Sequence, residues 1–299
     1  MVRPPIANCQ HLGALLHIYR NHFACSGRIR SASSSNSATV IKRYGGPGDL
    51  AIEERPTPVP TPGEVLIEIR AFGLNHAEIY MRKDAWGDVA EVTGIECVGT
   101  VKMDPGGRFK SGQKVFAIVG GMGRSRNGSY AEFVCAPASN VAAIDSDLPW
   151  EQLAAIPESY ATAWAALHGI LGNESSSAFL RESMPCSTLW ETRRCSIRLP
   201  CCVVADAFAW SAFWAAAVQT LEPVFQIPSG THLSVFASAL VTGTPAFPIE
   251  EIPYQRILAK VADGTFKAKP ARVFRFEETQ QAHRLIESSE AGGKVVVVT

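Results

Sequence analysis

Apolar and polar residues alternate along much of the first half of the chain, with the two-residue period of a β-strand. In EVLIEIRAF (residues 64–72), Val65, Ile67 and Ile69 share one face, and residues 66, 68 and 70 share the other. Further short runs of this kind are GIECVGTVKM (94–103), GQKVFAIVGG (112–121) and SYAEFVCAPASNVAAI (129–144), separated by glycines. The pattern predicts a small β-barrel or sandwich of short strands.

A helical period begins with DLPWEQLAAIPESYATAWAALHGIL (147–171), where Trp164, Leu167, His168 and Leu171 are spaced to share one face. His168 in such a place is more typical of a structural histidine than of a ligand. The remaining elements are predicted from similar patterns: strand HLSVFASAL (232–240), helix PYQRILAKVADGTFK (253–267), strand ARVFRF (271–276), helix EETQQAHRLIESSEAGG (277–293) and strand KVVVVT (294–299). The four valines of the last strand predict burial on both of its faces.

Composition and charge narrow the function classes. Lys plus Arg and Asp plus Glu number 28 each, so we expect a small-molecule partner and neither nucleic acid nor an acidic membrane. The most apolar run, residues 203–218, is shorter than the ~20 residues of a membrane span and contains Asp206, which favours a buried helix. Eight scattered cysteines without a CxxC pair are typical of a reducing compartment.

The first 48 residues contain no acidic residue and six basic ones, and they include the serine-rich segment RIRSASSSNSA. This composition is typical of a mitochondrial transit peptide, and an unstructured extension or a misassigned start explains it equally well. The location therefore stays open between the cytoplasm and the mitochondrion. We expect residues 1–38 to contribute nothing to the fold.

Several motifs in a fixed order resemble the medium-chain dehydrogenase/reductase superfamily, specifically its zinc-independent quinone oxidoreductase and enoyl reductase branch. They include YGGPGDLAIEERPTPVPTPGEVLIEIRAFGLNHAEIYMR (44–82), TGIECVGTV (93–101), GSYAEFVCAPASNVAAI (128–144) and KPARVFRFEETQQAHRLIESSEAGGKVVVV (269–298). The resemblance implies a mixed α/β fold, with a GroES-like β-barrel domain and a Rossmann-type parallel-sheet domain. It implies a catalytic domain at 39–171, a cofactor domain at 172–268 and a C-terminal return to the catalytic domain at 269–299.

The cofactor domain is predicted to be incomplete. A doubly wound sheet needs two βαβαβ halves, and residues 172–222 show no convincing strand, helix and strand. No G-x-G-x-x-G turn occurs in the chain, although such glycines let backbone N–H groups approach a pyrophosphate. GGMG at 120–123 comes closest and is interpreted as a hairpin loop. We hypothesise that half of an ancestral cofactor domain was lost by deletion, mis-splicing or an altered reading frame.

A zinc site is not expected. Zinc-dependent members of the superfamily use a Cys near the position of Asn75 and a His in a Gly-His-Glu triplet, which here reads Gly94-Ile95-Glu96. His76 alone is a weak ligand candidate, and the adjacent pair Cys201 and Cys202 is interpreted as incidental thiols. An alcohol dehydrogenase with relocated zinc ligands is a minor alternative.

The resemblance also implies the site residues. Asn75 and Tyr80 are expected beside the nicotinamide and the substrate as catalytic groups, and Thr162, Phe236 and Lys294 as cofactor-binding groups. Structural alternatives stay open for each of them: a turn for Asn75, the barrel core for Tyr80 and Phe236, a backbone bond for Thr162, and a solvated strand start for Lys294.

Two functions follow from these observations. The first is an oxidoreductase that uses NADPH or NADH to reduce a quinone or an activated C=C or carbonyl compound, with Tyr80 and Phe236 walling one crevice. The second is a non-catalytic remnant that serves as a binding or assembly module. Substrate identity and cofactor preference are open, as is the homodimer that relatives commonly form.

Overall fold

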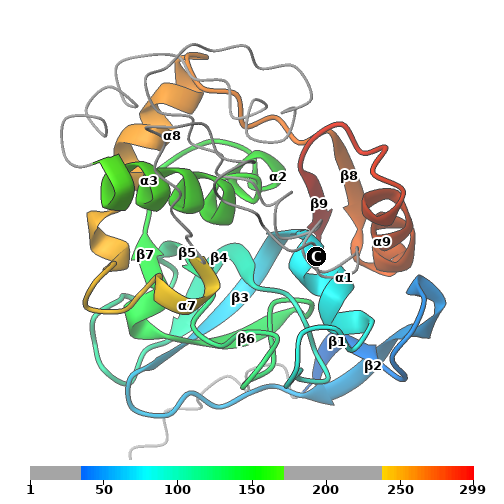
Figure 1. Ribbon diagram of the computed structural model, residues 1–299. Coiled ribbons are helices and arrows are strands. Elements are labelled where there is room, and N and C mark those ends of the chain that lie inside the picture. Colours follow the sequence, from blue (N-terminus) through cyan, green and yellow to red (C-terminus); the bar gives the residue numbers. More distant parts are fainter. Residues whose placement is uncertain (1–34, 172–237) are drawn as a thin grey trace, which may run out of the picture. The chain divides into compact units, whose positions relative to one another are not determined.

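The computed structural model describes residues 35–171 and 238–299 (Figure 1). Its strands are β1 (Ser35–Ile41), β2 (Leu50–Pro56), β3 (Glu64–Gly73), β4 (Glu96–Met103), β5 (Lys114–Ile118), β6 (Phe133–Pro137), β7 (Val141–Ala143), β8 (Arg272–Arg275) and β9 (Val295–Val298). Its α-helices are α1 (His76–Arg82), α2 (Trp150–Leu153), α3 (Pro157–Leu171), α7 (Ser238–Val241), α8 (Tyr254–Ala262) and α9 (Thr279–Glu287). The strands predicted at 64–72, 94–103, 271–276 and 294–299 are confirmed.

Seven strands form one sheet in the order β7-β5-β4-β3-β9-β8, with β6 also paired to β3, while β1 and β2 pair with each other. Strand β3 is the longest and organises the sheet. It pairs with β4 along one edge, and its other edge is shared by β6 over residues 64–68 and by β9 over residues 71–73. The C-terminal strand is therefore joined to the end of β3 by backbone hydrogen bonds.

An apolar core lies on each face of the sheet, and a register shift in β3 changes which of the two cores a residue faces. Val65, Ile67 and Ile69 point into one core, and the irregularity between Ile69 and Ala71 turns Ala71 into the other. Helix α9 packs in the first core, and helices α2, α3 and α8 contribute to the second. Valines 295–297 alternate between the two cores, which confirms that β9 is buried on both faces.

Two predicted elements differ from the structure. The helix expected over 147–171 is divided into α2 and α3, because Pro157 begins a new helix and lacks the N–H that a continuing helix requires. The strand expected over 232–240 is wrong at its end, since Ser238–Val241 is helical. There the Asn140 side chain donates to the Thr242 carbonyl, so a tertiary contact holds this turn. Residues 232–237 lie outside the described part of the chain.

Other predictions can be judged only in part. GGMG at 120–123 is a turn after β5, in which Gly120, Gly121 and Gly123 have positive φ, so the loop interpretation is confirmed. In the described ranges, 35–171 and 238–299, no helix is long and apolar enough to cross a membrane. The expectation that residues 1–38 contribute nothing to the fold is wrong at its end, because Ser35 begins β1 and Ala38 is buried in an apolar core. Residues 1–34, the run 203–218, the expected gap at 172–222 and the pair Cys201 and Cys202 lie outside the described ranges.

Candidate active site

The site is built where β3 ends and β9 begins. The Leu74 N–H donates to the Val295 carbonyl oxygen over 2.9 Å, which brings Asn75, the residue before α1, beside Lys294. A Cβ atom at Gly73 would lie 2.5 Å from both Glu96 Oε1 and Lys294 Cε. Only glycine at position 73 leaves room for these side chains to meet.

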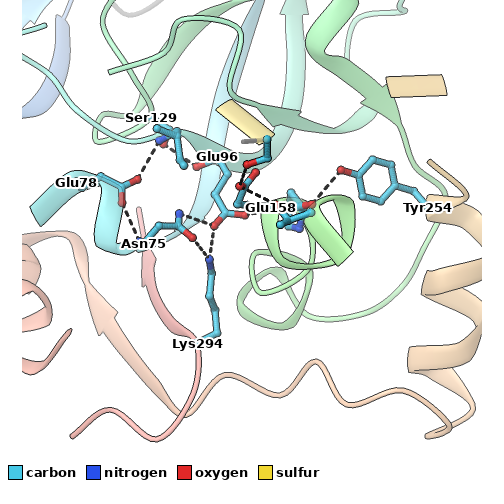
Figure 2. A network of polar contacts seen from close by, with 11 residues as sticks. Asn75, Glu78, Glu96, Ser129, Glu158, Tyr254 and Lys294 are labelled. Carbon is cyan, nitrogen blue, oxygen red and sulfur yellow. Dashed lines mark hydrogen bonds and ion pairs between the residues drawn. The ribbon is translucent and has the colours of Figure 1, made fainter. Parts of the chain in front are cut away.

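Where β3 ends and β9 begins, the side chain of Lys294 contacts the side chains of both Asn75 and Glu96 (Figure 2). Its Nζ donates to Asn75 Oδ1 over 2.6 Å and forms an ion pair with Glu96 Oε1. Asn75 Nδ2 in turn donates to Glu96 Oε1 over 2.9 Å. The side chain of Lys294 is 8% exposed and that of Glu96 is 0% exposed, so this triangle of contacts is almost closed to water. A buried ion pair of this kind requires such additional hydrogen bonds to offset desolvation.

Glu96 also ties the junction to helix α3. Its Oε2 accepts the N–H of Glu158 over 2.8 Å, at the N-terminus of α3, where the helix dipole favours a negative charge. The hydroxyl of Ser129 donates to the Glu96 backbone oxygen over 2.6 Å and holds the strand end in place. The carboxylate of Glu96 therefore joins three elements: α1, the start of β9 and α3.

The carboxyl group of Glu158 continues the network. Oε1 accepts hydrogen bonds from Thr162 Oγ1 over 2.9 Å and from Ser238 Oγ over 2.6 Å. Oε2 is enclosed and has no hydrogen-bond partner among the described residues. The pKa of Glu158 is raised to about 7, chiefly by burial and also by the charge of Glu96, while the two hydroxyl donors and Lys294 oppose the rise.

A third buried carboxyl group belongs to Glu78 on α1. It accepts the N–H of Asn75 over 2.8 Å and the N–H of Ile95 over 3.1 Å, so it caps the start of the helix. Burial raises the pKa of Glu78 to about 7. His76 belongs to the same helix, and burial followed by the charge of Lys294 lowers the pKa of its imidazole. We expect a neutral imidazole at physiological pH.

A cavity of about 260 Å³ lies next to this network. Its lining includes Ala77, Met81, Trp86, Ile95, Met122 and Arg124. Ala77 follows Asn75 by two residues and Ile95 directly precedes Glu96, so the same two segments supply the cavity wall and the polar network. Tyr80 stacks on Trp86 with the ring centroids 6.2 Å apart. The residues that line the cavity do not include Tyr80 itself.

The structure brings together three of the five residues that the sequence predicts for the site. Lys294 contacts Asn75 directly, and Thr162 joins them through Glu158 and Glu96. Lys294 is buried, so its interpretation as a solvated strand start is wrong. Tyr80 lies apart, against Trp86. Phe236 lies outside the described residues, and so does the side chain of His168.

Sequence reasoning missed Glu78, Glu96, Glu158 and Ser238. The local sequence could have marked two of these three acids. Glu96 stands between Ile95 and Cys97 in an apolar strand, where a buried charge needs a partner. Glu78 follows Asn75 by three residues, which is the spacing of a capping box. Nothing local marks Ser238, because its partner lies 80 positions earlier in the chain.

The side chains present do not fit a zinc ion. The two family positions for zinc ligands hold Asn75 and Ile95, which offer an amide and an alkyl group. Across residues 35–171 and 238–299, no group of three or more His, Cys, Asp or Glu side chains is arranged to hold a metal. Independence of zinc stays a prediction.

Two family models match the chain. The alcohol dehydrogenase GroES-like domain matches residues 61–146, and the zinc-binding dehydrogenase domain matches residues 203–297. The chain is 31% identical over 152 residues to a mouse synaptic vesicle membrane protein VAT-1 homolog-like, and 32% identical over 142 residues to human quinone oxidoreductase. These matches cover 49% and 44% of the chain, and 33% and 40% of the two relatives. The chain thus matches less than half of the length of either relative.

The fold is similar to that of solved oxidoreductase structures. A mycobacterial protein solved in complex with NADPH aligns with a TM-score of 0.64 at 19% identity, over 89% of this chain and 100% of that one. This likeness and the GroES-like match confirm the predicted mixed α/β fold. The two family models, matched in order on both sides of residues 147–202, confirm the predicted resemblance to the medium-chain dehydrogenase/reductase superfamily, and the shared fold agrees with it.

Proposed function

We propose that the protein transfers a hydride from NADPH or NADH to a quinone or to an activated C=C or carbonyl compound, without zinc. The observation that carries this proposal is the buried network around Lys294, which connects Asn75 with Thr162 through Glu96 and Glu158. Ordered polar side chains beside a largely apolar cavity are typical of a small-molecule site. The similarity to quinone oxidoreductases supports the choice of acceptor.

On the cofactor side, Thr162 would bind the nicotinamide carboxamide. Its hydroxyl proton is directed to Glu158 Oε1, so the hydroxyl oxygen offers only lone pairs to a ligand. It would therefore accept a hydrogen bond from the carboxamide NH2 group, which fixes one orientation of the ring. The bound cofactor would supply a hydride, which carries the electron pair that reduces the acceptor.

Both the oxygen and the nitrogen of the Asn75 side-chain amide are hydrogen-bonded. Its Oδ1 accepts from Lys294, and one hydrogen of Nδ2 goes to Glu96, which leaves the second hydrogen of Nδ2 for a ligand. A donor fixed in this way stabilises negative charge that develops on the acceptor oxygen better than mobile water does. Asn75 thus fits the role of a catalytic hydrogen-bond donor.

The cavity is suited to the acceptor. Met81, Trp86 and Ile95 give it walls against which a flat ring can pack, and its volume of about 260 Å³ fits a small aromatic compound. Tyr80 does not line this cavity but stacks on Trp86, which does, so in this proposal Tyr80 orients the Trp86 ring. The direct role as hydrogen-bond donor that the resemblance implies for Tyr80 stays a prediction.

A panel of acceptors tests the proposal. NADPH oxidation is followed with benzoquinones, naphthoquinones and α,β-unsaturated ketones, and we expect turnover above the buffer rate with at least one of them. Asn75→Ala should lower kcat/KM by about 100-fold, the typical effect of removing one fixed donor. Asn127→Ala, an exposed asparagine outside the network, serves as the matched control and should leave the rate unchanged. No turnover with any acceptor would refute the proposal.

One observation favours the non-catalytic alternative: the sequence contains no G-x-G-x-x-G turn to receive a pyrophosphate. In that case the GroES-like part would persist as a binding or assembly module. A titration of NADPH followed by its fluorescence separates the two functions, because saturable binding at low micromolar concentration would eliminate the remnant.

A further inference from the structure

We propose that Glu158 makes the site bind the oxidised, positively charged nicotinamide more tightly than the reduced, neutral one. The inference rests on the function proposed above and adds a residue that sets the direction of hydride transfer. Glu158 would act through its charge and through Thr162, as a positioning residue, rather than by contact with the reacting atoms.

The charges around the network motivate the proposal. Three carboxyl groups, Glu78, Glu96 and Glu158, are gathered in the described part of the chain around one ammonium, Lys294 (Figure 2). Lys294 is paired with Glu96. Glu78 is bound by two backbone N–H groups instead of a cation. When all three acids are ionised, negative charge exceeds positive charge in this buried region.

Glu158 is the acid whose charge is least compensated. Its hydrogen-bond partners, Thr162 and Ser238, are neutral hydroxyls, and its Oε2 has no partner among the described residues. Two other titratable groups nearby are also neutral at physiological pH. The Tyr254 phenol on α8, whose pKa burial raises well above its usual value, donates to the Pro157 carbonyl, and His76 on α1 has a lowered pKa.

The loss of a hydride gives the nicotinamide ring a positive charge. If the carboxamide bonds to Thr162, the ring lies close to Glu158, since the two side chains share a hydrogen bond. In a buried site, charges at such a separation attract each other strongly. An ionised Glu158 and an oxidised ring therefore stabilise each other, while the reduced, neutral ring gains nothing from the carboxylate.

This coupling predicts a dependence on pH with a definite sign. Glu158 has a pKa of about 7 in the free protein, and an adjacent positive ring would lower it. The affinity for NADP+ should then rise with pH, by up to about tenfold per pH unit, and become constant above about pH 7. The affinity for NADPH should not follow this rise. Because the two forms carry the same phosphates, the ratio of their affinities isolates the charge of the ring.

The experiment measures the dissociation constants of NADP+ and NADPH for the full chain between pH 5.5 and 8.5. We expect the preference for NADP+ over NADPH to increase about tenfold or more from pH 5.5 to pH 7.5. In Glu158→Gln the preference should be independent of pH. This variant keeps an oxygen that accepts from Thr162 and Ser238, so only the charge is removed.

Glu78→Gln is the matched control, because Glu78 is a second buried acid with a pKa of about 7, and it should retain the pH dependence. The inference is overturned if the wild-type ratio is constant with pH, or if Glu78→Gln and not Glu158→Gln abolishes the dependence. If Glu158→Gln does not fold, the wild-type ratio alone decides. If neither form of the cofactor binds, the proposed function fails and this inference fails with it, whereas equal binding at every pH refutes only the inference.

Discussion

Glu158 lowers the stability of the fold when it is ionised, although its charge is useful for binding the proposed ligand. A carboxyl group enclosed without a cation of its own is harder to ionise than in water, which is why its pKa rises to about 7. A protein selected for stability alone would place a neutral side chain there. We infer that the negative charge is kept for the ligand.

This cost should appear as a decrease in the free energy of unfolding as the pH rises. The pKa of Glu158 is about 7 in the folded chain and near the ordinary glutamate value of 4.5 in the unfolded chain, so the folded state holds the proton more tightly. The stabilisation is present below pH 4.5 and is lost as pH rises through about 7. Between pH 4.5 and 7.5 the wild type should therefore lose about 2–3 kcal/mol relative to Glu158→Gln, which does not titrate.

Urea unfolding of both proteins at several pH values checks this expectation. The quantity to compare is the change in the free energy of unfolding of each protein with pH. A constant effect of the amide group in Glu158→Gln on stability then cancels. A difference between the two proteins that stays constant from pH 4.5 to 7.5 would mean that Glu158 titrates as it does in water.

The residues of the site were predictable only where a family motif marks them. Asn75, Thr162 and Lys294 could be selected from the sequence by resemblance, and the structure connects them. The acids between them could not be placed, because Glu96 acquires its partner 198 positions later in the chain and Glu158 acquires Ser238 80 positions later. Pairing at such separations depends on the arrangement of strands, which no local pattern contains.

At the scale of elements, the site depends on how closely the end of β3 approaches the start of β9. Gly73 is the last residue of β3, and a side chain there would collide with Glu96, with Lys294 and with the Ala154 carbonyl, 2.9 Å from the position of a Cβ atom. The polar network thus requires a glycine at a position where strands generally favour larger residues.

Gly73→Ala should therefore destabilise the fold by about 1–3 kcal/mol, the usual cost of an added methyl group in a packed interior. It should also lower NADPH oxidation, because Lys294 is displaced from Asn75. Gly48→Ala is the matched control, since a Cβ atom at Gly48 would meet nothing within 4 Å, and its effect should stay within about 0.5 kcal/mol. Urea unfolding that finds the two variants equally stable would contradict the close approach.

Most elements could be predicted from periodicity, and the exceptions have identifiable causes. The alternation of Val65, Ile67 and Ile69 predicted one face of β3 correctly, but a register shift further along moves Ala71 to the opposite core. No pattern of apolar residues reveals such a shift. The short helix Ser238–Val241 was mistaken for a strand because its place is set by Asn140, far away in the sequence.

At the scale of the whole molecule, the chain combines a GroES-like part with a sequence that lacks the glycine-rich turn of the superfamily that it resembles. The polar network joins residues from both described ranges, whereas the cavity is lined by residues between Ala77 and Ser125 alone. The balance of 28 basic and 28 acidic residues also fits a partner recognised by local contacts rather than by net charge. The proposed activity therefore requires that the chain binds NADPH or NADH without this turn.

Transfer of isotope from the cofactor tests the central claim most directly. NADPH carrying deuterium at both hydrogen positions of nicotinamide C4 is incubated with the protein and an α,β-unsaturated ketone. Reduction places the hydride on carbon, and the product is analysed by mass spectrometry. We predict a reduced ketone that contains one deuterium, formed more slowly by Lys294→Met than by the wild type. A product without deuterium, or no product above the rate in buffer, would contradict hydride transfer at this site.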